Sequence, residues 1–217
     1  FEMSYFINKN IGPLIIVVAN VIPIMFFVLG GGLEETNPYR LAGKLFGIIG
    51  AITLSLNFVI STRTRFIDRL FWGMNRAYII HHILGAIALV LLLFHPLTLV
   101  IPYLSFSARA ALNFLIPIPL SSNLSNWYGL TSLVIMLVLL FLTFFASLNY
   151  QLWLTTHKLL GIPLIFALLH VITTSSDTTS NSLLRFYLFG WIITAICCYI
   201  YRTLFGKYLV QTTKYKI

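Results

Sequence analysis

The chain has 217 residues, of which 59% are hydrophobic and only 9% are charged. A soluble domain of this length needs far more charge to cover its surface, so the composition excludes an ordinary soluble protein and indicates that lipid is the solvent. The formal net charge of +9 resides in loops between long apolar runs. Membrane topology and anionic lipid therefore explain it better than nucleic acid does, and no nucleic-acid partner is expected.

Six apolar runs are each close to the length of about 20 residues that a membrane-spanning helix needs. In chain order the predicted spans are 11–30, 41–60, 78–101, 127–147, 153–173 and 183–204. Pro23 predicts a kink in the first span. The longest segment between spans, 102–126, carries three prolines and is expected along the membrane interface or over the bundle. The sequence thus predicts an all-α membrane protein, a bundle of six transmembrane helices.

The distribution of lysine and arginine predicts the orientation of this bundle, because cytoplasmic loops carry an excess of both. With the N-terminus in the cytoplasm, ten of these residues fall on the cytoplasmic side and four on the outer side. We therefore expect both termini in the cytoplasm. The ten are Lys9, Arg63, Arg65, Arg69, Arg76, Lys158, Arg202, Lys207, Lys214 and Lys216, and the four are Arg40, Lys44, Arg109 and Arg185.

All five histidines lie in the third and fifth predicted spans, as His81, His82, His95, His157 and His170. An ionisable residue inside a span usually marks a functional site, although a single histidine often only joins two helices by a hydrogen bond. His81 precedes His95 by 14 residues, and His157 precedes His170 by 13. These spacings correspond to about 21 Å and about 20 Å along a helix axis. Because both spans run in the same direction, the two histidines of one lie level with those of the other.

Two imidazoles that face each other at one level suit a haem whose iron is bound from both sides. The spacing therefore predicts two stacked b-type haems, one near each leaflet. His81 with His157 would bind the inner haem, and His95 with His170 the outer haem. His82 competes with His81 for the inner position, and we prefer His81 because its angular phase matches that of His95 better.

Angular phase is less simple in the fifth span. A separation of 13 residues leaves two side chains about 140° apart on an ideal helix, whereas 14 residues leaves them within about 40°. The fifth span must therefore deviate from an ideal helix. Gly161 and Pro163 lie between its histidines and could supply a kink.

Further candidates for haem contacts are two glycines and three basic residues. Gly85 and Gly161 each follow an inner histidine by four residues and could leave room for a flat macrocycle, although ordinary helix packing explains them equally well. Haem propionates need cationic partners. Arg69 and Arg76 are available on the inner side and Lys44 on the outer side, with membrane topology as the alternative explanation.

The stretch RFIDRLFWGMNRAYIIHHILGAIALVLLLFHPL, residues 65–97, resembles the ferric reductase-like transmembrane domain family, as does WLTTHKLLGIPLIFALLH, residues 153–170. That family includes ferric reductases and NADPH oxidases, and the resemblance implies the same four histidines as haem ligands. It also implies that residues 1–204 form the membrane domain of a bacterial flavocytochrome in the inner (plasma) membrane. Residues 205–217 would then lead toward a cytoplasmic FAD and NAD(P)H module outside this sequence.

The expected function is transmembrane electron transfer from a cytoplasmic flavin reduced by NAD(P)H, through the haems, to an extracytoplasmic acceptor such as ferric iron or oxygen. Iron with two histidine ligands has no open position, so the chain acts as an electron relay and no catalytic residue is expected. One alternative is a stand-alone haem subunit that passes quinone or flavin electrons to a periplasmic reductase. Another is a haem-free transporter with a histidine relay, which predicts acidic residues in the spans. The six predicted spans contain none.

Overall fold

The computed structural model describes residues 2–116, 123–174 and 181–206, and every element within them is a helix. Six segments of these residues are long and apolar enough to cross a membrane. This confirms the prediction of an all-helical protein with six candidate membrane-spanning helices. They are α1 (Glu2–Leu29), α2 (Pro38–Ile60), α4 (Met74–Leu104), α6 (Leu124–Phe145), α7 (Tyr150–Lys158) followed by α8 (Gly161–Thr173), and α10 (Ser182–Ile200).

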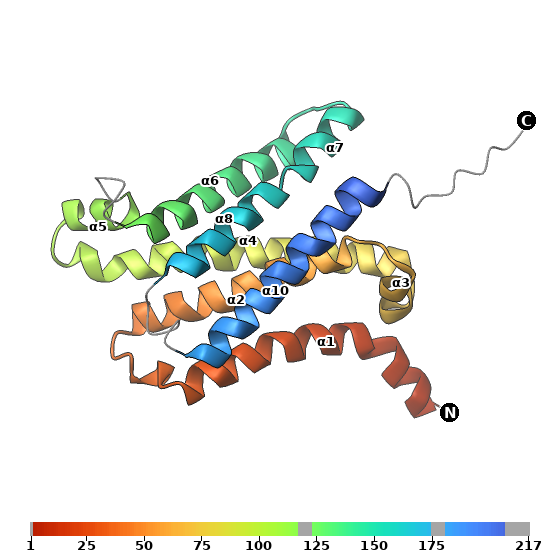
Figure 1. Cartoon of the computed structure of the whole chain (residues 1–217), viewed down its shortest axis with the longest axis horizontal. Coiled ribbons are helices and arrows are strands. Elements are labelled where there is room, and N and C mark those ends of the chain that lie inside the picture. Colours follow the sequence, from red (N-terminus) through yellow and green to blue (C-terminus); the bar gives the residue numbers. More distant parts are fainter. Residues whose placement is uncertain (1, 117–122, 175–180, 207–217) are drawn as a thin grey trace, which may run out of the picture.

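Within the described residues, four shorter helices connect or extend these segments. The 3₁₀ helix η1 (Gly32–Glu34) follows α1, α3 (Arg65–Phe71) precedes α4, α5 (Ala108–Leu115) follows α4, and the π-helix η3 (Tyr201–Phe205) extends α10. Figure 1 shows the N-terminus, α3, α7 and the end of α10 at one end of the bundle, with α5 at the other. The expected junction toward a flavin module lies outside the described residues from residue 207 onward.

A row of glycines on α2 brings this helix close to α4. A Cβ atom on Gly43 would lie 2.6 Å from the Leu99 side chain, and one on Gly50 would lie 2.9 Å from Leu92. In a membrane, where lipid is as apolar as leucine, small residues allow two helix backbones to approach and pack closely. The glycines therefore set the distance between α2 and α4, and with it the surroundings of the histidines on α4.

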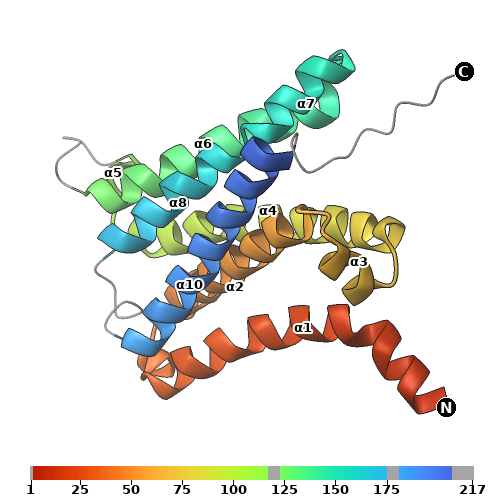
Figure 2. The ribbon, with the colours of Figure 1, turned by 45° about the vertical axis from the view of Figure 1, so that its right-hand side comes forward.

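The fifth predicted span remains one candidate membrane crossing, Tyr150–Thr173, but its helix is interrupted, in agreement with the deviation that the spacing of its histidines predicted. It is divided into α7 and α8, with Leu159 and Leu160 between them (Figure 2). The N–H groups of Leu160 and Ile162 bond to carbonyls three residues earlier, as in a tight turn. The reason is Pro163, which has no N–H to bond to the carbonyl of Leu159 and whose ring would collide with that carbonyl in a continuous helix.

Candidate functional site

The structure brings four of the five histidines together in two pairs. His81 and His95 lie on α4, His157 on α7 and His170 on α8. The ring centroids are 6.3 Å apart in the pair His81–His157 and 6.2 Å apart in the pair His95–His170, and the ring planes meet at 72° in both. An imidazole nitrogen binds a transition metal at about 2 Å, so two imidazoles on opposite sides of one ion have ring centres roughly 6 Å apart. Each pair therefore has the separation that one shared metal ion requires.

The break between α7 and α8 resolves the angular mismatch of the fifth span. In a continuous helix His157 and His170 would point about 140° apart. Because α8 starts again at Gly161, its rotation is independent of α7. Both histidines can therefore turn toward α4.

His82 takes a different position from His81. It is exposed, and its ring lies 4.4 Å from that of Tyr78 on the preceding turn of α4. The ring of His81, by contrast, is half-buried and pairs with His157. The two neighbouring histidines thus have different partners, because His81 pairs with His157 and the ring of His82 meets that of Tyr78.

Three of the four paired histidines are oriented by a backbone carbonyl. A carbonyl oxygen only accepts hydrogen bonds, so each Nδ1 carries the proton and leaves Nε2 with a free lone pair. That tautomer is the one that metal-binding histidines commonly adopt. The Nδ1 to oxygen distances are 3.3 Å from His81 to Asn57, 2.7 Å from His95 to Gly43 and 2.8 Å from His170 to Ser125.

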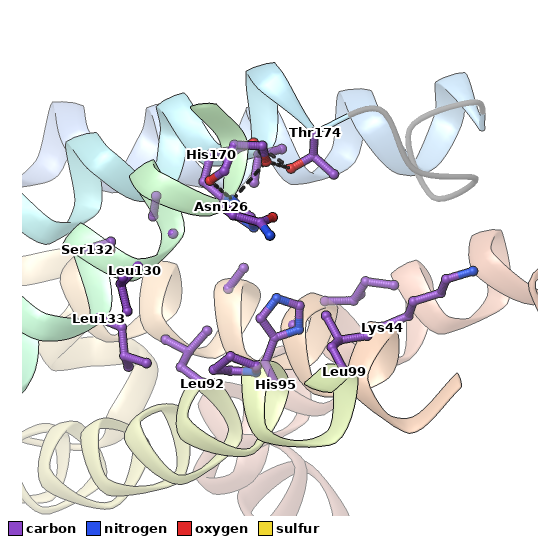
Figure 3. A pocket seen from close by; sticks show the side chains of 18 of the residues that line it. Lys44, Leu92, His95, Leu99, Asn126, Leu130, Ser132, Leu133, His170 and Thr174 are labelled. Carbon is purple, nitrogen blue, oxygen red and sulfur yellow. Dashed lines mark hydrogen bonds between the residues drawn. The ribbon is translucent and has the colours of Figure 1, made fainter. Parts of the chain in front are cut away.

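The outer pair lines a cavity of about 340 Å³ between α2, α4, α6, α8 and α10. Figure 3 shows His95 on one wall, with His170 and Asn126 on the opposite wall and Lys44 toward one end. Most of the lining is leucine, isoleucine and other apolar residues. Apolar walls, two facing imidazoles and a cation at the edge form a suitable environment for a large apolar ring with acidic substituents.

Two glycines that sequence reasoning missed make room for the outer pair. A Cβ atom on Gly47 of α2 would lie 2.7 Å from Nδ1 of His95, and one on Gly129 of α6 would lie 3.0 Å from Nδ1 of His170. Both lie on helices without histidines, so their contact with a histidine depends on how their helix packs against a neighbouring one. The regular spacing of Gly43 and Gly47 was the one available signal, since small residues four apart indicate close helix packing.

The two glycines that the sequence singled out have other neighbours. A Cβ atom on Gly161 would collide with the ring of Tyr199 on α10, so this glycine admits an aromatic side chain from a neighbouring helix. A Cβ atom on Gly85 would meet only the side-chain amide of Asn57, at 3.2 Å. Gly161 thus matches the alternative of ordinary helix packing.

Lys44 is one of the three basic residues predicted to contact haem, and it lines the outer cavity. Arg40 lines the same cavity. The Lys44 Nζ atom lies 2.9 Å from Oε2 of Glu35, and this hydrogen bond, more than the nearby charges, lowers the pKa of Glu35. Arg76 instead reaches Oδ1 of Asn10 on α1, at 3.5 Å, and Arg69 is exposed on α3.

At the inner level the cation Arg63 interacts electrostatically with both His81 and His157. It has a positive φ of 53°, in the loop between α2 and α3. A non-glycine residue rarely adopts this backbone conformation unless its surroundings hold it there. In the sequence, Arg63 is one of several basic residues predicted on the cytoplasmic side, and no local feature distinguishes it from its neighbours.

The residues present fit a haem better than a bare metal ion. Within the ranges that the structure describes, no group of three or more His, Cys, Asp or Glu residues could hold a metal. Each histidine pair therefore offers two ligands. A porphyrin supplies the remaining equatorial nitrogens itself, so two axial histidines complete its coordination.

The family model described as "Ferric reductase like transmembrane component" matches residues 46–169, more than half of the chain. The match begins within α2, includes His81, His95 and His157, and ends one residue before His170. No curated protein sequence matches the chain. The resemblance seen in the sequence is therefore confirmed, and the chain belongs to the family of ferric reductase-like transmembrane components.

Proposed function

We propose that this chain is the electron-transferring membrane part of an oxidoreductase and holds two bis-histidine b haems. The observation that carries the proposal is the pair of histidine contacts at two levels, with ring centroids 6.3 Å and 6.2 Å apart. Electrons would pass from a cytoplasmic flavin, reduced by NAD(P)H on a module outside this sequence, to an acceptor on the other side. Ferric iron is the acceptor that the family membership favours, and oxygen is the other candidate.

When bound, a bis-histidine haem exchanges single electrons without an open coordination position. The residues of the chain have supporting roles. Gly43, Asn57 and Ser125 offer the carbonyl oxygens that hold three imidazoles in one orientation. The mostly apolar lining of the outer cavity disfavours water beside the electron path.

The charges around the two levels support the same proposal. Lys44 and Arg40 at the edge of the outer cavity are placed to pair with haem propionates or to attract an anionic acceptor. Arg63 is the corresponding cation at the inner level. The excess of basic residues on the side that carries Arg63 supports a cytoplasmic position for that side, in a plasma membrane.

A reduced-minus-oxidised absorption spectrum of the purified chain, with haem stoichiometry, tests the proposal. We expect two low-spin b haems per chain. Replacing His95 or His170 by alanine should remove one haem, and replacing His81 or His157 should remove the other. A chain without haem, or one whose haem content is unaffected by all four substitutions, would refute the proposal.

A further inference from the structure

His157 is held differently from the other three paired histidines. Its Nδ1 atom is buried and has no hydrogen-bond acceptor within the described ranges of the chain. Its ring instead lies nearly parallel to the indole of Trp153, at an interplanar angle of 7° and a centroid separation of 5.4 Å. This is the offset-stacked arrangement that aromatic rings prefer, and the two residues are one helical turn apart, where side chains meet.

Trp153 is itself held by two side-chain contacts, at the start of a capped helix. Its Nε1 atom donates a hydrogen bond to the carbonyl of Thr143 on α6, at 3.2 Å. Its ring also stacks with Tyr150, at 6.1 Å and 22°. The start of α7 is capped by the side chain of Asn149, which accepts from the N–H of Leu152 at 2.9 Å. The indole is therefore a rigid surface on which the imidazole of His157 rests.

We propose that Trp153 is a positioning residue for His157 and replaces, by ring stacking, the carbonyl hydrogen bond that orients the other paired histidines. The inference rests on the proposed function, because the orientation matters through the iron that His157 would bind. The stack restricts rotation of the imidazole about its Cβ–Cγ bond. It thereby fixes the angle of 72° between the ring planes of His157 and His81.

The difference also has a chemical consequence. An Nδ1–H group that donates to an oxygen makes its imidazole a stronger ligand, and His157 lacks that bond within the described residues. In the outer pair both imidazoles have short carbonyl bonds, at 2.7 Å and 2.8 Å. A ferric iron bound at the inner level would therefore be less stabilised by its ligands than one bound at the outer level. This contribution favours a higher reduction potential for the inner haem.

Interfacial tryptophans are common in membrane proteins, where they face the headgroups and anchor a helix. Trp153 has contacts that an anchoring role does not explain. Its Nε1 atom donates to the carbonyl of Thr143, its ring face stacks on His157, and its side chain is half-buried. Tyr150, which is 68% exposed, is the member of the stack with the features of an anchor.

The test compares Trp153→Phe, which keeps an aromatic face, with Trp153→Leu, which keeps bulk and removes the face. Trp191→Leu is the matched control, a membrane tryptophan on α10 that packs on Tyr187. The readouts are haem content, the EPR spectrum of the oxidised protein and the two midpoint potentials. The EPR spectrum is informative because the g values of a bis-imidazole haem depend on the angle between the ring planes. The His81→Ala and His95→Ala variants assign each signal to the inner or the outer haem.

We expect Trp153→Phe to retain both haems with nearly unchanged spectra. Trp153→Leu should shift the inner-haem EPR signal and potential, or weaken retention of the inner haem by about 10- to 100-fold, with the outer haem unchanged. Unchanged inner signals in Trp153→Leu would overturn the inference. Equal loss of both haems would also overturn it, since Trp153 would then support the bundle and not one ligand. A wild-type chain without haem would instead refute the proposed function.

Discussion

Gly47 provides the sharpest test of the outer site, because a methyl group added at this position would collide with His95. The Cβ atom of Gly47→Ala would lie 2.7 Å from Nδ1 and 2.8 Å from Cε1 of His95. Carbon atoms do not approach a ring this closely, so the imidazole must move. It cannot move freely, since its Nδ1 atom is bonded to the carbonyl of Gly43 at 2.7 Å.

The size of the effect follows from these contacts. An extra methyl group in a packed interior costs about 1–3 kcal/mol. Weakening the hydrogen bond of His95 adds about 1 kcal/mol. If the strain falls on the bound geometry of His95, the affinity of the outer haem should fall by about 10- to 100-fold, the range typical for lost support of a metal ligand.

Haem stoichiometry and the reduced-minus-oxidised spectrum measure this effect, with Gly190→Ala as the control. A Cβ atom on Gly190 would meet no atom of the described residues within 4 Å, so the control gains helix propensity without a clash. Gly129→Ala, with a closest approach of 3.0 Å to His170, should have a smaller effect. A Gly47→Ala protein that holds the outer haem as firmly as Gly190→Ala, with unchanged midpoint potential, would refute the reasoning.

Three further predictions concern other parts of the bundle. His82→Ala should retain both haems whereas His81→Ala loses the inner one, because His82 is exposed beside Tyr78; haem content decides, and equal loss in both variants would contradict the assignment. The pKa of Glu35 is lowered from its ordinary value of 4.5, so its bond to Lys44 stabilises the fold fully at pH values above 4.5. This contribution is lost as the pH falls through the lower pKa of the folded state. On acidification, the midpoint temperature of thermal unfolding should therefore fall more steeply in the wild type than in Glu35→Gln. Parallel plots of this temperature against pH would show that the pair contributes nothing. Pro163→Ala restores an N–H at the break between α7 and α8, so it should favour a continuous helix, turn His170 away from His95 and lower outer-haem content; full occupancy would show that packing alone maintains the break.

The helices and the depths of the histidines followed from the sequence alone. A bilayer demands long apolar helices, so six runs of suitable length were enough to predict six candidate spans. The rise per residue of a helix is constant, so spacings of 14 and 13 residues set two matching levels before any packing was known. The family could also be named from these segments, since its marks are local in the chain.

Only the tertiary structure decided which groups meet at each level. The sequence contains Pro163, but whether it kinks, breaks or merely bends the fifth span depends on what packs around it, and the result was a break that lets His157 and His170 both face α4. The space beside His95 is left by Gly47 on α2, a different helix. The carbonyl that accepts the hydrogen bond of His95 belongs to Gly43 on that same helix. Contacts between helices depend on their rotation and approach, which summed packing sets across the whole bundle. No local pattern in one helix contains that information.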